Sequence, residues 1–428
     1  MKDHDKRTRI AYLIEAGFEH FIALFVTGTM LGYILDTLGF SDAMQGIIST
    51  VATFTCGAQL FALLLVGKRR QRIVTLGHFI NQSCFALLYL LPLFDLGPNT
   101  RTALLVGLLF TGHIINNAIN PAKITWLMGS VKNEHRGRFT AVKEMLSLAG
   151  GIAVSVGFGR IADIYRSADG MPTRPYYVIC SIALTLMMLI HTATLLVSRE
   201  KPEPTPERTS VRSTVARLFR SRDLIRVIGV GILWNVASAI SVSFFASYLR
   251  EELAFSFTTI ALMSTLGSVC RIAASPLLGR IADKHSFATS MTISFAAAAL
   301  AFLSMSFTAP TTRWLYLVYA CLHAFAMAGI NSGVINLIYD YVAPADRAVA
   351  MGVKNALGGI LAFFTALLSG LLLGKIQTSG GIHLFGITVY AQQALALIST
   401  LVIILLIIYM LKVIAPLKKV DISESDNS

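Results

Sequence analysis

The chain contains a long series of apolar stretches, each about long enough to cross a lipid bilayer as a helix. A membrane-spanning helix needs about 20 mostly apolar residues. Only 14% of the 428 residues are charged, whereas soluble domains carry roughly a quarter. We therefore predict an all-α membrane protein with twelve transmembrane helices. The predicted spans are residues 12–35, 44–66, 73–93, 103–130, 139–164, 176–198, 224–249, 258–278, 287–308, 314–340, 348–373 and 388–411.

Lysine and arginine concentrate in every second loop between these spans. Of the 36 basic residues, 25 lie on one predicted side of the membrane, seven on the other and four within spans. Cytoplasmic loops carry the excess of basic residues. We therefore predict a multi-pass protein of the cytoplasmic (plasma) membrane with both termini cytoplasmic. This sidedness accounts for the net charge of +13 without a nucleic-acid partner.

The sequence gives no support for several other classes of protein. The five cysteines fall within predicted spans without C-x-x-C spacing, which predicts neither a disulfide framework nor a metal site. The phosphate-binding G-x-x-x-x-G-K-[ST] loop of an ATP-driven pump is missing, as are the H-E-x-x-H and G-x-S-x-G motifs of hydrolases. We therefore predict a protein that is not an enzyme, with no catalytic residue, no metal ligand and no cofactor.

The two halves of the chain carry the same residue types at equivalent positions. Glycine and basic residues of the first half recur in the second half at nearly constant separation, which favours a duplicated architecture over the general tendency of such residues to end membrane helices. The matched pairs are Gly67 and Gly279, 212 residues apart, and Arg136 and Arg347, Lys143 and Lys354, and Asn120 and Asn331, each 211 residues apart. We predict two six-helix halves, 1–198 and 224–411, a cytoplasmic central loop, 199–223, and a cytoplasmic tail, 412–428.

At these loops the chain resembles the major facilitator superfamily of secondary transporters. That family has a pattern close to G-x-x-x-D-[RK] after spans two and eight, and Gly279, Asp283 and Lys284 match it. The first-half loop keeps Gly67 but has Gln71 at the acidic position. The resemblance implies two pseudo-symmetric six-helix bundles, alternating access and a monomeric protein.

The resemblance also implies a set of gating residues. In the family, the motif's charged groups hold the two halves together at their cytoplasmic ends, and Gln71 should weaken the first-half contact. The alternative is that these basic loops only set the topology. The expected gating and interdomain residues are Gly67, Arg136, Glu144, Gly279, Asp283, Lys284 and Arg347.

Ionisable residues deep inside spans are costly and are therefore functional candidates. Arg271 lies roughly 12 Å from Gly279 along its helix, and Glu19 about 13 Å from Ile10. A buried carboxylate without a permanent partner can load and release a proton, so Glu15 and Glu19 are the predicted proton-coupling residues. A charge switch, either Glu144–Arg271 or Glu19–Arg271, is a further hypothesis.

A string of amides marks the middle of the helices that, by the family resemblance, line a central cavity. Such groups need partners inside the membrane, and hydrogen bonding between helices is the alternative to substrate contact. We favour substrate contact. The predicted substrate-binding residues are Asn116, Asn117, Asn120, Trp234, Asn235, Arg271 and Asn331.

Together these features predict a secondary active transporter that moves a small polar solute by alternating access, with proton coupling expected. Because Arg271 lies deep in a span, the predicted solutes include those that carry a carboxylate or a phosphate. The predicted partners are this small molecule, protons and membrane lipids. Two alternatives stay open: an exporter of lipophilic compounds or drugs, favoured by the 25 phenylalanines, and a non-transporting receptor on a transporter fold.

Overall fold

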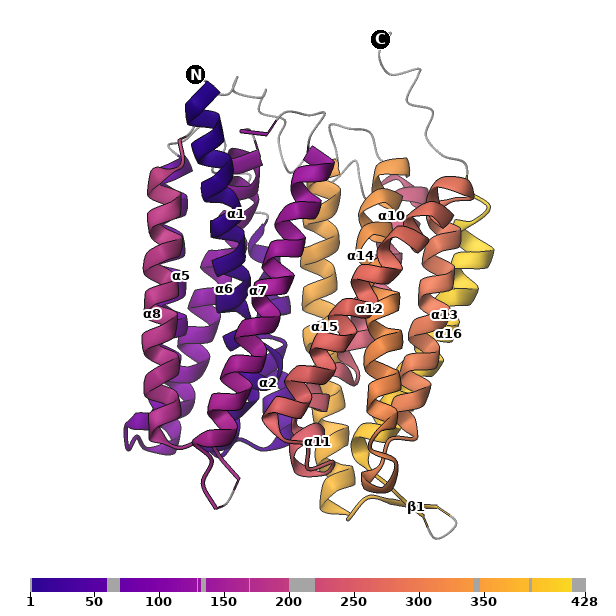
Figure 1. Cartoon of the computed structure of the whole chain (residues 1–428). Helices are drawn as coiled ribbons and strands as arrows, with labels where there is room; N and C mark the ends of the chain where they lie inside the picture. Colours follow the sequence, from indigo (N-terminus) through magenta and orange to yellow (C-terminus); the bar gives the residue numbers. More distant parts are fainter. Residues whose placement is uncertain are drawn as a thin grey trace. The chain divides into compact units, whose positions relative to one another are not determined.

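The chain is almost entirely helical in a computed structural model (Figure 1). The structure describes residues 2–59, 70–128, 130–131, 136–168, 170–199, 220–341, 347–384 and 387–417. Its long helices are α1 (Lys2–Phe25), α5 (Arg70–Leu88), α6 (Pro98–Met128), α7 (Arg136–Ile164), α8 (Arg174–Val197), α10 (Arg222–Ala239), α12 (Phe257–Lys284), α13 (Phe287–Ser306), α14 (Leu315–Tyr341), α15 (Arg347–Thr378) and α16 (Ala391–Tyr409).

Short elements complete these helices. A helical turn continues α16 as a π-helix over Met410–Ile414. The remaining elements are α2 (Gly28–Thr37), α3 (Asp42–Ser49), α4 (Val51–Phe54), α11 (Phe245–Glu251), β1 (Ile382–Leu384) and β2 (Ile387–Val389), with 3-10 turns at Leu91–Leu93, Val242–Phe244 and Pro310–Thr312. The two strands form an antiparallel hairpin in which Ile382 pairs with Val389.

The prediction of an all-α, multi-pass membrane protein is confirmed. Within the described residues, eleven segments are long and apolar enough to cross a membrane. The structure describes the predicted second span, 44–66, only as far as Gln59. In this described part, α3 and α4 occupy the beginning of the span. Twelve membrane helices are therefore consistent with the structure.

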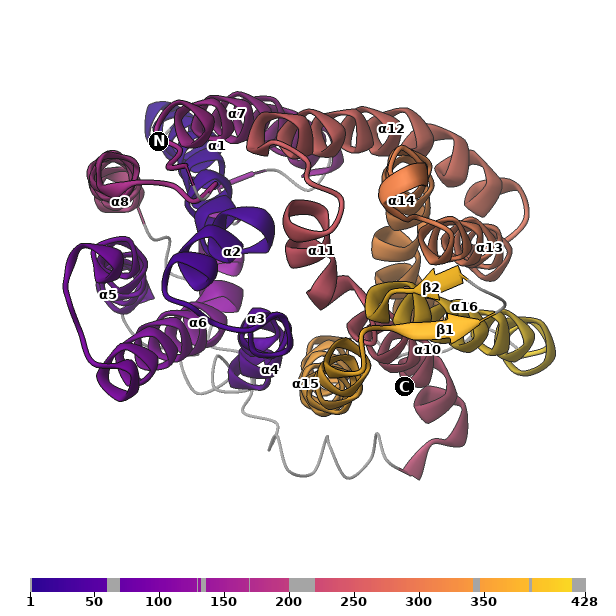
Figure 2. The same ribbon diagram turned by 90° about the horizontal axis from the view of Figure 1, so that it is seen from below.

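The chain divides into two compact units. Unit 1 comprises Met1–Glu207 and Ser256–Ala261, and unit 2 comprises Arg208–Phe255 and Leu262–Ser428. In unit 1, α1 packs against α7 and α8, and α5 packs against α6 and α8 (Figure 2). In unit 2, α13 packs against α14 and α16, and α10 packs against α15. The predicted domain bounds stay predictions, because most of the central loop, 200–219, lies outside the described residues.

The first turn of α12 is held within unit 1 by Asp163, near the end of α7. The Asp163 carboxylate accepts hydrogen bonds from the backbone N–H groups of Phe257 (3.1 Å) and Thr258 (2.9 Å), and also from the Thr258 hydroxyl. The first N–H groups of a helix have no partner within the helix, and a carboxylate there also gains from the helix dipole. This explains why Ser256–Ala261 cluster with unit 1.

The first span is interrupted between α1 and α2. Gly28 has a φ of +53°, a conformation that most residues with a side chain avoid. The Tyr89 hydroxyl donates to the Phe25 carbonyl at the end of α1 (2.8 Å), and the Tyr177 hydroxyl donates to the Tyr33 carbonyl in α2 (3.0 Å). Backbone carbonyls inside a membrane need such partners, so a buried tyrosine just after α5 and one in α8 stabilise the break.

Two glycines let α7 approach α1 closely. A methyl group added at Gly150 would lie 2.3 Å from the Phe21 ring, and one at Gly151 would lie 2.7 Å from Nε2 of His20. Small residues permit this close packing of membrane helices. The Gly150-Gly151 pair therefore serves helix packing within unit 1.

Gln71 caps the end of α8. Its Nε2 lies 2.8 Å from the carbonyl oxygen of Ser198, 3.2 Å from that of Leu196 and 3.3 Å from that of Leu195. The last carbonyls of a helix have no partner within the helix and carry partial negative charge. An amide can donate to them, whereas a carboxylate can only accept. Glutamine at the position where the family motif has an acid thus suits a structural contact inside unit 1.

We expect Gln71→Glu to destabilise the protein, because it removes the donor and places a negative charge against the carbonyl end of α8. The loss should be about 1–3 kcal/mol, seen as a lower melting temperature of the purified protein. Asn99→Asp makes the same change of amide to carboxylate at an exposed site and should leave the melting temperature nearly unchanged. Equal melting temperatures for Gln71→Glu and the wild type would contradict this account.

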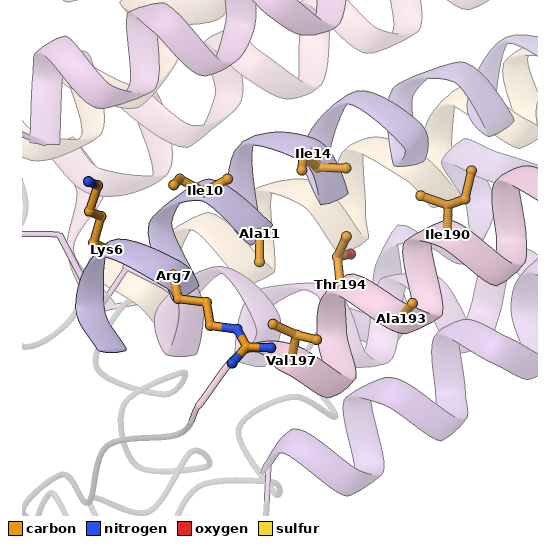
Figure 3. Close-up of a pocket in the computed structure, with 9 residues that line it drawn as sticks. All are labelled: Lys6, Arg7, Ile10, Ala11, Ile14, Ile190, Ala193, Thr194 and Val197. Carbon is orange, nitrogen blue, oxygen red and sulfur yellow. The ribbon is translucent and has the colours of Figure 1, made fainter. Parts of the chain in front are cut away.

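A groove of about 510 Å³ runs between α1 and α8 on the surface of unit 1 (Figure 3). Basic side chains lie at one end of it and apolar side chains continue from them along both helices. The lining residues are Lys6, Arg7, Ile10, Ala11, Ile14, Ile190, Ala193, Thr194 and Val197.

Candidate functional site

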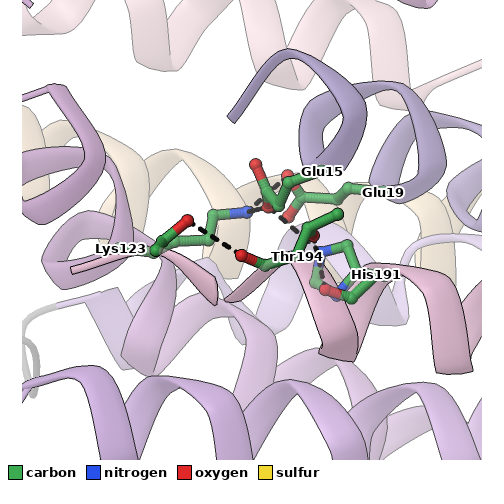
Figure 4. Close-up of polar contacts among 6 residues, drawn as sticks. Glu15, Glu19, Lys123, His191 and Thr194 are labelled. Atoms are coloured by element: carbon green, nitrogen blue, oxygen red, sulfur yellow. Dashed lines mark hydrogen bonds and ion pairs between the residues drawn. The ribbon is translucent and has the colours of Figure 1, made fainter. Parts of the chain in front are cut away.

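A buried cluster of ionisable side chains joins three helices of unit 1 (Figure 4). Nζ of Lys123 on α6 lies 2.8 Å from Oε1 of Glu15 on α1 and also pairs with Oε2 of Glu19. Nε2 of His191 on α8 lies 3.0 Å from the same Glu15 oxygen. Lys123 and Glu15 are each 1% exposed and His191 is 0% exposed, whereas Glu19 is 29% exposed. One member of the cluster is therefore open to its surroundings.

The helices themselves bring these groups together. Glu15 and Glu19 are four residues apart, so they lie on one face of α1, and the long apolar stem of Lys123 carries its ammonium between them. The Thr194 hydroxyl donates to the His191 carbonyl (2.6 Å) one turn below the imidazole. Side chains from separate helices thus meet at one point inside unit 1.

A second histidine lies behind the first. His78 on α5 is fully buried, and its ring centroid lies 5.0 Å from that of His191. Neither ring nitrogen of His78 has a hydrogen-bond partner among the described residues, and the same holds for Nδ1 of His191. The cluster therefore extends from Glu19 to a fourth helix, with hydrogen-bonding capacity left unused.

The formal charges of the cluster do not balance. Two carboxylates, Glu15 and Glu19, face one ammonium, Lys123. Uncompensated charge in a membrane interior is costly. A proton bound anywhere in the cluster would remove the surplus negative charge, so the arrangement is suited to taking up and releasing one proton.

The prediction that Glu15 and Glu19 lack a permanent partner is wrong. Lys123 on α6, which was not considered as a partner from the sequence, pairs with both. Arg271 belongs to unit 2, so the Glu19–Arg271 and Glu144–Arg271 pairs stay predictions.

The amides of α6 separate into two groups. Asn117 accepts a hydrogen bond from Gln59 (3.1 Å) and donates to the Thr55 hydroxyl (3.0 Å) and the His113 carbonyl (3.0 Å). Its hydrogen-bonding capacity is therefore largely taken up by neighbouring helical segments. Oδ1 of Asn120, in contrast, is buried without a partner among the described residues.

Helix geometry aligns the remaining amides with the ion cluster. Asn116, Asn120 and Lys123 occur at spacings of four and three residues, which places them on one face of α6. Asn116 and Asn120 are both half-buried. A polar stripe thus runs along α6 and ends at the Lys123 ammonium.

The predicted substrate residues of unit 2 lie in different environments. Trp234 is 6% exposed and packs in an aromatic cluster, with its ring 5.8 Å from Phe295 and 6.4 Å from His323. Asn235 lies against Gly358 of α15, Arg271 is half-buried and Asn331 is exposed. Substrate contact at these positions stays a prediction.

The predicted gating residues also stay predictions. Glu144, Asp283 and Lys284 have exposed side chains, and Gly279 lies in α12. Arg136 and Arg347 begin α7 and α15, but their side chains, like the whole of Gly67, lie outside the described residues.

Sequence reasoning missed Lys123, His191 and His78. Lys123 lies five residues before the end of α6, about 8 Å along the helix, where a lysine can usually reach the interface. The available signal was its spacing of three residues from Asn120 and the need of two buried glutamates for a cation. The histidines carried no such signal, because their contacts depend on how α5 and α8 pack.

Comparison with known protein families identifies the chain. A family model described as Major Facilitator Superfamily matches residues 16–248 and 227–426. The chain belongs to this superfamily. It is therefore a membrane transporter, not an enzyme, of a family whose members bind small-molecule substrates. A search of curated protein sequences finds no match.

Solved structures of superfamily transporters share the fold. A mutant of the nucleoside transporter NupG is 13% identical, with a TM-score of 0.72 over 94% of this chain and 99% of that one. An auto-inhibited peptide transporter of the POT family is 13% identical, with a TM-score of 0.70 over 97% and 98%. A bacterial homologue of the iron transporter ferroportin, outward-facing, is 13% identical, with a TM-score of 0.62 over 95% and 98%. At such identities the likeness concerns the fold alone.

The described part of the chain contains no group of three or more His, Cys, Asp or Glu side chains arranged to hold a metal ion. No disulfide bond joins cysteines in that part of the chain. The ion cluster itself consists of two carboxylates, one ammonium and one imidazole.

We expect Lys123→Met to destabilise the protein strongly, because it leaves Glu15 and Glu19 without their cation. Removing one partner of a buried ion pair costs about 3–5 kcal/mol, so the melting temperature should fall clearly. Adding Glu15→Gln to Lys123→Met removes the buried charge and should restore part of the loss. Lys375→Met, at an exposed helix end, is the matched control. A double variant no more stable than Lys123→Met would contradict the coupling.

Proposed function

We propose that this superfamily member is a secondary active transporter that couples the movement of a small polar solute to protons by alternating access. The observation that carries this proposal is the buried cluster of Glu15, Glu19, Lys123 and His191, with its unequal number of carboxylates and ammonium groups. We further propose that the protein lies in the cytoplasmic membrane with both termini cytoplasmic, because the predicted spans put 25 of its 36 basic residues on one side and cytoplasmic loops carry the excess of basic residues.

Glu19 is the proposed site of proton exchange. Glu15 is buried and contacts both Lys123 and His191, whereas Glu19 pairs with Lys123 and is 29% exposed. Glu19 is thus the carboxylate of the cluster that is open to exchange, and a proton bound there would remove the surplus charge while Lys123 keeps Glu15 as its counter-ion. His191 supports this state by its contact with Glu15, and His78 lies next to it as a further imidazole.

The proposed solute contacts in unit 1 are Asn116 and Asn120. Oδ1 of Asn120 is a buried acceptor without a partner in the described part of the chain, and such groups call for an explanation, a bound donor being one. Both amides share a face of α6 with Lys123. A solute that touched Asn120 would therefore lie about one helical turn from the ammonium that holds the carboxylates, which would link solute binding to protonation.

These contacts favour a polar solute over a lipophilic one. Two of the similar structures are a nucleoside transporter and a peptide transporter, and nucleosides and peptides are both polar molecules with several hydrogen-bonding groups. They are the first compounds to test here. Arg271, Asn235 and Asn331 remain the proposed contacts from unit 2, and Arg271 extends the proposal to solutes with a carboxylate or a phosphate.

The first experiment is a melting-temperature screen of the purified protein against nucleosides, dipeptides and small carboxylates. A solute at 100 times its Kd stabilises the folded state by about 2.7 kcal/mol. Uptake of the identified solute into proteoliposomes then separates a carrier from a non-transporting receptor. Binding without any flux would overturn the transport proposal.

We expect Glu19→Gln to abolish proton-driven accumulation, because a neutral amide cannot exchange a proton. The variant should still exchange solute across the membrane down its gradient, and a protonophore should no longer change its uptake. Asp95→Asn, at an exposed loop position of unit 1, should keep the wild-type response to a protonophore. Concentrative uptake by Glu19→Gln under a proton gradient would refute proton exchange at Glu19.

We expect Asn120→Ala and Asn117→Ala to fail in different ways. Asn120→Ala removes an acceptor that no described residue uses, so the melting temperature should stay unchanged. The Kd of the solute should rise about tenfold, because losing one hydrogen bond costs about 1.4 kcal/mol of binding free energy. Asn117→Ala breaks contacts to Gln59 and Thr55 and should lower the melting temperature. Unchanged solute affinity in Asn120→Ala would remove this residue from the proposed site.

A further inference from the structure

We propose that the groove between α1 and α8 is a binding site for an anionic phospholipid. One acyl chain would fill the apolar part of the groove, and the phosphate would lie against Lys6 and Arg7 (Figure 3). This inference uses the proposed cytoplasmic position of the N-terminus but does not depend on the proposed solute or on proton coupling.

The walls of the groove offer contacts to hydrocarbon. From α1 come Ile10 and Ile14, which are 50% and 43% exposed, and from α8 come Ile190 and Val197. Thr194 is the polar residue in this part of the lining, and its hydroxyl is already bonded to the His191 carbonyl (2.6 Å). A polar ligand would find little to bond to here, whereas an acyl chain would gain apolar contact on both sides.

The small residues Ala11 and Ala193 shape the groove. They lie on α1 and α8, helices that pack against each other, and neither side chain extends far beyond the backbone. Larger side chains at these two positions would fill the space between the helices. The hollow therefore depends on them and can be closed by a single substitution.

The length of the groove suits one leaflet of a bilayer. From Arg7 to Ile14 the rise along α1 is about 11 Å at 1.5 Å per residue. Half of a hydrocarbon core of about 30 Å is about 15 Å. With the N-terminus in the cytoplasm, the basic end of the groove lies at the headgroup level, and its apolar end reaches most of the way to the bilayer midplane.

The charge at the open end selects the headgroup. Lys6 and Arg7 are both exposed, and neither forms an ion pair with a residue that the structure describes. Basic residues next to the cytoplasmic leaflet attract anionic lipids. A lipophilic solute without charge would leave both cations unused, so the combination of groove and cations fits an anionic phospholipid.

Native mass spectrometry of the full-length protein in detergent tests this inference. The probes are phosphatidylglycerol and phosphatidylcholine with identical acyl chains, so that only the headgroup differs. We expect the wild type to retain phosphatidylglycerol preferentially. In the double variant Lys6→Gln/Arg7→Gln the apparent Kd for phosphatidylglycerol should rise about 30-fold, which corresponds to about 1 kcal/mol for each basic residue.

Matched variants separate the groove from the general surface. Ala193→Trp should fill the groove and lower the retention of both lipids, whereas Leu189→Trp, on an exposed position of the same helix that does not line the groove, should not. Lys412→Gln, an exposed basic residue of unit 2, should keep the headgroup preference. Equal retention of the two lipids by the wild type, or an unchanged preference in Lys6→Gln/Arg7→Gln, would overturn the proposal.

Discussion

The ion pair between Glu15 and Lys123 is the interaction on which the interior of unit 1 depends. Both groups are 1% exposed, so either charge without the other would strongly destabilise the fold. Together with His191 they tie α1, α6 and α8 at one point. Because neither charge is stable without the other, these helices have one favourable relative placement. The same requirement makes the site sensitive to protonation, since a change of one charge alters the balance that holds it.

Close helix packing is the second condition for this cluster. α1 can present its glutamates inward only if its other faces fit their neighbours, and Gly150 and Gly151 allow α7 to contact Phe21 and His20 directly. Gln71 serves the same purpose at the end of α8, where its amide bonds three backbone carbonyls. Some polar and small residues of unit 1 thus form the ion cluster, and others support helix packing. Position in the sequence alone does not tell which role a residue has.

Hydropathy was enough to predict most of the spans, since a membrane-crossing helix must be largely apolar, and eleven such segments lie in the described residues. Arg136 and Arg347, which the repeat matched as loop residues, are the first residues of α7 and α15. The site was harder to predict. Glu15 and Glu19 were found because they lie deep in a span, whereas Lys123 lies near a helix end, where depth carries no information. Asn117 and Asn120 look alike in sequence, yet Asn117 is bonded to Thr55 and Gln59 while Oδ1 of Asn120 has no partner among the described residues. Only packing decides between them.

The groove and the ion cluster share a wall. Ile14 and Ile190 line the groove, and the next residues along the chain, Glu15 and His191, belong to the cluster. Thr194 joins the two, because it lines the groove while its hydroxyl bonds the His191 carbonyl. An acyl chain in the groove would keep water away from the lipid side of α1 and α8, and charge interactions strengthen where water is excluded. Water would then reach the cluster through the exposed part of Glu19 rather than through the groove. A bound lipid would in this way make one side of the cluster apolar and leave the other open for proton exchange.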